Sequence, residues 1–109
     1  MTQANPRGKV YFVDTTLRDG QLSLWASNMR TGMMLPIAER LDRAGFEAIE
    51  IMSSAFYKKC VRDLHDDPWE RIRLLAKLIR KTPLRSIRSR SMLAFQLTAP
   101  AITDLWLER

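Results

Sequence analysis

The sequence Val10-Tyr11-Phe12-Val13 runs directly into Asp14-Thr15-Thr16-Leu17-Arg18-Asp19-Gly20. The first four residues are β-branched or aromatic, which predicts a buried β-strand. The residues that follow carry too many hydrogen-bonding groups to continue as core, so the strand is expected to end there. Parallel α/β enzymes place functional groups at the carboxyl ends of their strands. Arg18 and Asp19 are therefore candidates for chemistry.

A helix and a second strand are predicted next. The helix is expected to begin with Thr31 as its N-cap and to end at Gly45, with a kink at Pro36. Its apolar residues recur at helical spacing and are Met34, Ile37, Ala38 and Leu41. The second strand is predicted over Phe46 to Met52.

A second helix is predicted between Asp67, as its N-cap, and Pro83, with Pro68 in the first turn. Its expected buried stripe is Ile72, Leu75, Ala76 and Ile79. The residues expected on its solvated sides are Arg71, Arg73, Lys77 and Arg80. Residues 84–91 have a spacing that allows a strand but few apolar side chains. A third helix is predicted from about residue 98, and it carries Ile102, Leu105 and Trp106.

The order of elements is therefore βαβαβα, with strand starts 36 and 38 residues apart. Strands that alternate with crossover helices require a parallel sheet. A (β/α)8 TIM barrel of about 250 residues allots roughly 31 residues to each unit. We therefore expect an α/β fold made of the first three βα units of such a barrel, with a three-stranded open sheet as the alternative. Residues 1–9 would be a tail, and residues 10–109 would be the N-terminal part of the barrel, ending within its third helix.

Composition and charge exclude several classes of protein. The chain has 109 residues, 46% of them apolar, and a net charge of +6. No stretch approaches the ~20 apolar residues of a membrane span, and residues 1–9 lack the apolar stretch of a signal peptide. The single cysteine, Cys60, excludes an internal disulfide framework. These features predict a cytoplasmic protein with no membrane partner.

The excess positive charge lies in the second half of the chain. Residues 55–109 hold twelve basic and six acidic residues, and residues 71–90 hold eight basic residues and no acidic one. Such a run of basic residues is typical of proteins that bind nucleic acid. We instead expect these side chains to form the solvated sides of an amphipathic helix, because long basic stems commonly cover apolar surface. The sequence thus predicts no nucleic-acid partner.

Three charged side chains near the strand ends could act together. A carboxylate at Asp19 can bind a divalent cation, and the guanidinium of Arg18 can hold a carboxylate or stabilise an enolate. Glu50, near the end of the second predicted strand, could fix that guanidinium by a charge-assisted hydrogen bond. On spacing alone, a surface ion pair is the competing interpretation.

Three motifs carry a resemblance to a known family. Asp14–Ala26 resembles the opening signature of the pyruvate carboxyltransferase superfamily, also called the DRE-TIM metallolyases. Ile49–Tyr57 and Asp67–Arg73 (D-P-W-E-R-I-R) look like its biotin-dependent carboxyltransferase branch, which includes pyruvate carboxylase, transcarboxylase and oxaloacetate decarboxylase. Arg88–Phe95 lines up with the R-G-Q-N-L-L-G-Y motif of that branch. The resemblance covers residues 10–95.

The resemblance implies a role for each matching residue. Asp19 matches the carboxylate ligand of a divalent metal, and Arg18 matches the arginine that stabilises the enolate. Glu50 matches the glutamate that orients this arginine. Arg88 is the best match to the arginine that holds the keto-acid carboxylate, and Arg90 is the alternative match.

Other positions depart from the family pattern. The family glutamine that contacts substrate is replaced by Leu22, and Gln21 stands one place earlier as its candidate substitute. Ser53 and Ser54 replace a pair of glycines, and Lys58 replaces an aspartate. The family's two metal-binding histidines and its modified lysine belong to later strands. The only histidine, His65, is expected in an exposed loop with no ligand role.

The function implied by the resemblance is metal-dependent carboxyl transfer on a 2-keto acid of the pyruvate or oxaloacetate type, through a metal-stabilised enolate. The implied cofactors are a divalent metal (Zn, Mn, Co or Mg) and carboxybiotin delivered by a biotin carrier domain, and a homo-oligomer is compatible with the full-length protein. The 109-residue chain alone is expected to be inactive. The alternatives are an aldolase or acyl-CoA lyase of the same superfamily, and a catalytically dead basic binding module.

Overall fold

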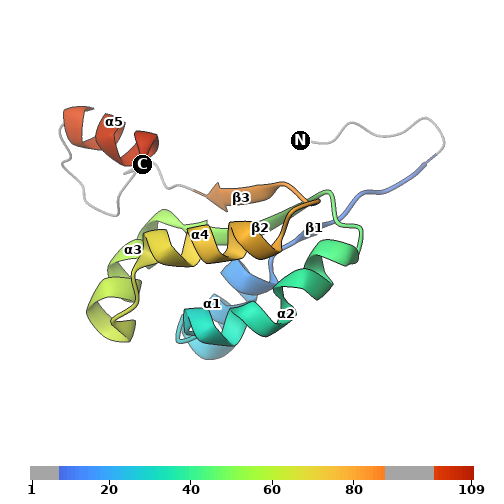
Figure 1. The fold of residues 1–109 in the computed structure, drawn as a ribbon, viewed down its shortest axis with the longest axis horizontal. Coiled ribbons are helices and arrows are strands. Elements are labelled where there is room, and N and C mark those ends of the chain that lie inside the picture. Colours follow the sequence, from blue (N-terminus) through green and yellow to red (C-terminus); the bar gives the residue numbers. More distant parts are fainter. Residues whose placement is uncertain (1–7, 88–99) are drawn as a thin grey trace.

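The computed structural model describes residues 8–87 and 100–109. Their elements, in chain order, are β1 (Val13–Asp14), η1 (Thr16–Gly20), α1 (Gln21–Trp25), α2 (Thr31–Arg43), β2 (Ala48–Ser53), α3 (Ser54–Lys59), η2 (Cys60–Leu64), α4 (Pro68–Leu78), β3 (Leu84–Ile87) and α5 (Pro100–Glu108) (Figure 1). The elements η1 and η2 are single turns of π-helix. The predicted alternation of strands and helices is confirmed.

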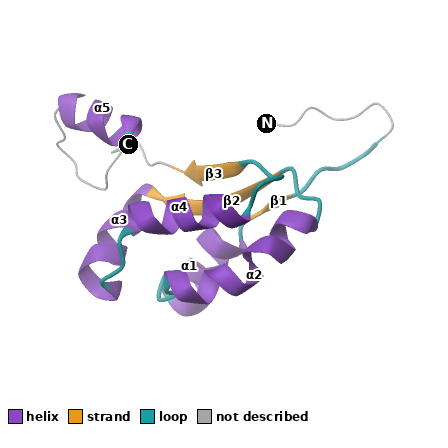
Figure 2. Ribbon diagram, in the orientation of Figure 1, coloured by secondary structure: helices purple, strands orange, loops and turns teal. Residues whose placement is uncertain are grey.

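The three strands form one parallel sheet in the order β1-β2-β3 (Figure 2). In this sheet Asp14 lies opposite Ile49, and Ile49 lies opposite Leu84. The register shifts between Glu50 and Met52, which marks a β-bulge in the central strand. The parallel sheet predicted from the crossover helices is thus confirmed, and so is a strand within the ambiguous stretch 84–91.

Helices α2 and α4 pack side by side, and Figure 1 shows α1 to α4 gathered on one side of the sheet. The buried apolar core between these layers is Leu17, Met34, Ala38, Ile49, Ile51, Met52, Phe56, Cys60, Leu64, Leu75 and Ile79. No helix within residues 8–87 and 100–109 is long and apolar enough to cross a membrane.

The first strand is shorter than predicted. Val10 and Phe12 are 68% and 66% exposed, and only Val13 and Asp14 pair with β2. The carbonyl of Phe12 accepts one hydrogen bond from the backbone N–H of Glu47, at 2.8 Å. An apolar run becomes a buried strand only where a neighbouring strand or helix covers it. The prediction of a buried strand over residues 10–13 was therefore wrong for its first three residues.

The N-terminus of α2 is capped by a residue far away in the sequence. The Asp66 Oδ2 atom accepts the backbone N–H of Thr31 at 3.0 Å, and Thr31 is the first helical residue rather than the N-cap. The predicted N-cap was wrong because the Asp66 carboxylate takes this N–H, while the Thr31 hydroxyl accepts a hydrogen bond from Arg71. The predicted helix end is confirmed, since Gly45 follows the helix with a left-handed φ of 85°.

The C-terminal end of α4 is tied to α2 by Asp42. Its carboxylate accepts the backbone N–H groups of Arg80, Lys81 and Thr82 at 2.8–3.2 Å. Burial alone would raise the pKa of Asp42, but these hydrogen bonds outweigh it and lower the pKa to about 2. At the other end of α4, Asp67 accepts the Trp69 N–H at 2.9 Å, which confirms the predicted N-cap.

The buried face of α4 differs from the predicted stripe. Leu75 and Ile79 are buried as expected, but Ala76 is exposed. Arg71, expected in solvent, is completely buried. The face is rotated because Arg71 finds hydrogen-bond acceptors and an aromatic ring inside the protein.

Candidate functional site

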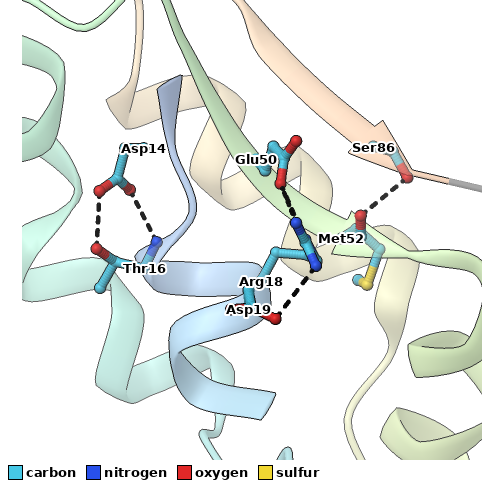
Figure 3. Close-up of polar contacts among 7 residues, drawn as sticks. All are labelled: Asp14, Thr16, Arg18, Asp19, Glu50, Met52 and Ser86. Atoms are coloured by element: carbon cyan, nitrogen blue, oxygen red, sulfur yellow. Dashed lines mark hydrogen bonds and ion pairs between the residues drawn. The ribbon is translucent and has the colours of Figure 1, made fainter. Parts of the chain in front are cut away.

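The turn after β1 is built around Asp14. Its carboxylate accepts the Thr16 hydroxyl at 2.7 Å and the Thr16 backbone N–H at 3.2 Å (Figure 3). The Thr15 carbonyl then accepts the N–H groups of Arg18 and Gly20 at 3.2 and 2.9 Å. This π-helical turn brings Arg18 and Asp19 directly to the carboxyl end of β1, and such turns occur frequently at functional sites.

Arg18 is fixed to Glu50 on the neighbouring strand. Its Nε and Nη2 atoms both donate to the Glu50 Oε2 atom, at 2.9 and 2.6 Å (Figure 3). The side chains are 22% and 9% exposed, so solvent screens this ion pair only weakly. One edge of the guanidinium is thereby held by Glu50, and the third nitrogen, Nη1, donates to Asp19 Oδ1 at 3.4 Å.

The β-bulge lies next to this ion pair. The register shift falls between Glu50 and Met52, and the Ser86 hydroxyl donates to the Met52 carbonyl at 3.2 Å (Figure 3). Bulges next to active sites re-aim side chains, and here the bulge begins at the residue that holds Arg18.

Asp19 lies beside Arg18 and is the more exposed of the two side chains. Its Oδ1 atom is 3.4 Å from Arg18 Nη1, and half of its side chain is exposed. An exposed carboxylate with one weak contact can ligate a hard divalent cation, so Asp19 fits the role of a single metal ligand. Across residues 8–87 and 100–109, no group of three or more histidine, cysteine, aspartate and glutamate side chains could hold a metal ion.

Gln21 is the inward member of the Gln21–Leu22 pair. It is buried and its Oε1 atom accepts the Met29 backbone N–H at 3.3 Å, whereas Leu22 is half exposed. Gln21 and Arg18 line the same small cavity, of about 10 Å³. A cavity of this size holds about one water molecule. The remaining lining residues are Leu17, Leu22, Ser27, Ile51, Met52, Ser53 and Phe56.

Known proteins resemble the chain in sequence. No family model matches it. It is 51% identical over 78 residues to a pyruvate carboxylase subunit from Methanocaldococcus jannaschii, a match that covers 72% of this chain and 14% of the relative. It is 30% identical over 107 residues to the methylmalonyl-CoA carboxyltransferase 5S subunit of Propionibacterium freudenreichii, covering 97% of this chain and 21% of the relative.

The chain also resembles solved structures of pyruvate carboxylase. The carboxyl transferase domain of Rhizobium etli pyruvate carboxylase, crystallised with 3-bromopyruvate, superposes with a TM-score of 0.67 at 34% identity. This match covers 72% of the chain and 13% of that structure. The chain is a homologue of the carboxyltransferase region of pyruvate carboxylase. It spans about a sixth of the length of the curated carboxylases that it matches.

Other residues singled out in this carboxyltransferase homologue lie apart from the Arg18–Glu50 pair. Arg88 and Arg90 fall outside the described residues. His65 is exposed and left-handed, as expected for a loop. Cys60 is completely buried, and this burial raises the pKa of its thiol to about 11, which leaves an unreactive thiol.

The carboxyltransferase homologue also contains a group beside the site that the sequence did not reveal. Arg71 connects Met29, Thr31 and Asp66 by hydrogen bonds. One feature of the sequence could have indicated that Arg71 is buried. Arg71 stands at the start of a helix, where the helix dipole disfavours a cation, so a buried set of acceptors was a reasonable inference.

Proposed function

We propose that this chain forms the first three βα units of a (β/α)8 carboxyltransferase domain acting on a 2-keto acid, with residues 1–9 as a tail. The observation that carries the proposal is the Arg18–Glu50 ion pair, which links the turn at the carboxyl end of β1 to Glu50, the third residue of β2. Glu50 follows Ile49, which lies opposite the last residue of β1, so the pair lies level with the carboxyl end of β1. Parallel α/β enzymes assemble their active sites at this edge. The homology to the carboxyltransferase region supports the same reaction class.

In this proposal Arg18 stabilises the negative charge that develops on the keto oxygen when the substrate forms an enolate. A preorganised cation is effective here because it needs no rearrangement as charge develops. Glu50 is a positioning residue, since it accepts the Nε and Nη2 N–H groups of Arg18 at 2.9 and 2.6 Å, while Nη1 makes only the longer, 3.4 Å contact to Asp19. Nη1 is therefore the nitrogen proposed to meet the substrate. A lysine at position 18 could not be held in this way, because it lacks the planar fork.

Asp19 would supply one carboxylate ligand to a divalent metal, and that metal, when bound, polarises the keto oxygen. Gln21 would donate its side-chain amide to the substrate, while its Oε1 atom remains engaged by Met29. Arg88 would hold the substrate carboxylate. Carboxybiotin on a carrier domain would be the co-substrate, the full-length protein could form a homo-oligomer, and the isolated chain would be inactive.

A chimera tests the proposal. The matching segment of the Methanocaldococcus jannaschii protein is replaced by residues 10–87 of this chain, and carboxylation of pyruvate is measured. We expect an active chimera, with kcat lowered about 10²–10³-fold by Arg18→Lys. The matched control is Arg62→Lys, because Arg62 forms an exposed ion pair with Asp63 away from the cavity. Equal losses in both variants would refute the assignment.

The same chimera separates the alternative reaction. Leu22 lines the cavity beside Arg18 without offering a hydrogen bond, which is the observation that favours an aldolase or acyl-CoA lyase. A chimera that leaves pyruvate unchanged but cleaves an acyl-CoA or aldol substrate would establish that alternative. A chimera that folds but is inactive in both assays would support the remaining alternative, a catalytically dead binding module.

A further inference from the structure

Arg71 is the largest completely buried side chain in the described part of the protein. A buried cation is unfavourable unless neighbouring groups stabilise it, and burial accordingly lowers the pKa of the Arg71 guanidinium. Its surroundings must therefore provide specific contacts. They come from the start of α2 and the loop before it, from α3, and from the loop directly before α4.

Two of the three guanidinium nitrogens donate hydrogen bonds, whereas Nη1 is buried without a hydrogen-bond partner among the described residues. Its Nε atom donates to the Thr31 hydroxyl at 2.8 Å, and its Nη2 atom donates to the Met29 carbonyl at 2.9 Å. The Nη2 atom also lies 3.3 Å from Asp66 Oδ2. The Cζ atom of the guanidinium lies over the Phe56 ring, 4.8 Å from the ring centroid, which is a cation–π distance.

Two of these contacts lead directly to the candidate site. The Met29 residue that accepts from Arg71 donates its own N–H to Gln21 Oε1, at 3.3 Å. The Phe56 ring that lies beneath the Arg71 guanidinium lines the cavity together with Gln21 and Arg18. Arg71 thus contacts the supports of two cavity walls without lining the cavity itself.

We propose that Arg71 is a positioning residue of the candidate site, and this rests on the function proposed above. Its fork holds the loop before α2 and the helix α3 at a constant separation. Through Met29 and Phe56 it sets where Gln21 stands beside Arg18. Lysine cannot replace it, because an ammonium has neither the fork that reaches Thr31 and Met29 together nor the flat face that covers Phe56.

The test uses the whole 109-residue chain and hydrogen exchange of single backbone amides by NMR. The variant is Arg71→Lys, and the control is Arg73→Lys, an exposed arginine in the same helix. The Met29 amide reports the contact to Gln21. The Ile49 amide, which donates to the Pro83 carbonyl at 2.9 Å within the sheet, reports global opening.

We expect Arg71→Lys to speed exchange at Met29 about tenfold, with a shift of the Gln21 side-chain amide signals, and to leave Ile49 nearly unchanged. Arg73→Lys should change neither amide. Equal acceleration at Met29 and Ile49 would mean that Arg71 contributes only to overall stability and would overturn the proposal, as would no change at Met29.

If the Arg71→Lys chain does not fold, Thr31→Val takes its place. It removes the acceptor of the Nε hydrogen bond, together with the hydroxyl that bonds the Asp66 carboxylate, and keeps the backbone N–H that Asp66 accepts. Selective acceleration at Met29 supports the proposal, and uniform acceleration overturns it. Exchange needs no substrate. The positioning role can therefore succeed or fail independently of the chimera that tests the proposed function.

Discussion

The substitution Glu50→Gln tests how strongly the Arg18 guanidinium is held. Glutamine keeps the size and one acceptor oxygen of glutamate but removes its charge. Two N–H groups of Arg18 bind the same oxygen at 2.6 and 2.9 Å. The Arg18 donor remains a cation, so a hydrogen bond to glutamine is still assisted by one charge but loses the attraction between opposite charges. Charge-assisted hydrogen bonds span about 1.5–3 kcal/mol, so we expect a loss of about 1 kcal/mol for each bond. Because Arg18 is 22% exposed, we expect a total loss of about 1–2 kcal/mol in the free energy of unfolding.

Urea unfolding followed by far-ultraviolet circular dichroism measures this loss. For a urea dependence of about 2 kcal/mol per M, the middle of the range for small proteins, the midpoint should fall by about 0.5–1 M with an unchanged slope. Glu50→Asp separates charge from position, since it keeps the charge but withdraws the carboxylate by one methylene. We expect it to destabilise the chain at least as much as Glu50→Gln, because neither short contact can form.

The control is Asp63→Asn. The Asp63 side chain is 35% exposed and pairs with Arg62, which is 61% exposed, and with Lys59, which is 25% exposed. Solvent screens such a pair, so its loss should shift the midpoint far less. The reasoning would be refuted if Glu50→Gln and Asp63→Asn gave the same shift. It would also be refuted if Glu50→Asp matched the unmodified chain.

Three further outcomes are expected. Ala26 ends α1 with a left-handed φ of 50°, so Ala26→Gly should raise the free energy of unfolding by about 0.5–1 kcal/mol, measured by urea unfolding; a loss of stability would contradict this. Asp42 has its pKa lowered from 3.8 to about 2, so its stabilisation is complete above pH 3.8 and is lost as the pH falls through 2. Asp42→Asn should therefore remove the part of acid unfolding that falls in this window, and an unchanged acid transition would count against it. Cys60, whose pKa burial raises to about 11, should react with a thiol reagent at mildly alkaline pH only after urea unfolding, and rapid labelling of the folded chain would show that it is accessible.

The sequence predicted features that depend on local patterns. The alternation of apolar runs and capped helices predicted the parallel sheet, and the Asp67-Pro68 pair predicted the start of α4. The predicted positions of Arg18 after the first strand and of Glu50 near the end of the second implied that they could meet, and they do, although Glu50 is the third of the six residues of β2. Spacing could not distinguish this from a surface ion pair, because burial at the pair depends on the residues packed around it.

The sequence predictions that were wrong concern contacts between residues distant in the sequence. Nothing local to Thr31 indicates that Asp66 takes its N–H, and helical periodicity assigns Arg71 to solvent because it ranks residues by polarity alone. The exposure of Val10 and Phe12 has the same origin, since their apolar character says nothing about which element covers them. Each error is a case in which a partner at least 34 residues away, or the lack of cover by described residues, decided the outcome.

The two capping carboxylates restrict how this part of the protein can move. Asp66 holds the first N–H of α2, and Asp42 holds the backbone that follows α4. Sliding one helix along the other by a single turn, about 5.4 Å, would break the hydrogen bonds at both ends together. A sliding motion of α2 along α4 is therefore energetically unfavourable. The small cavity beside Arg18 can therefore open by a rigid rotation of the helix pair, by a movement of the turn that carries Arg18, or by a movement of α3, whose Phe56 lines the cavity.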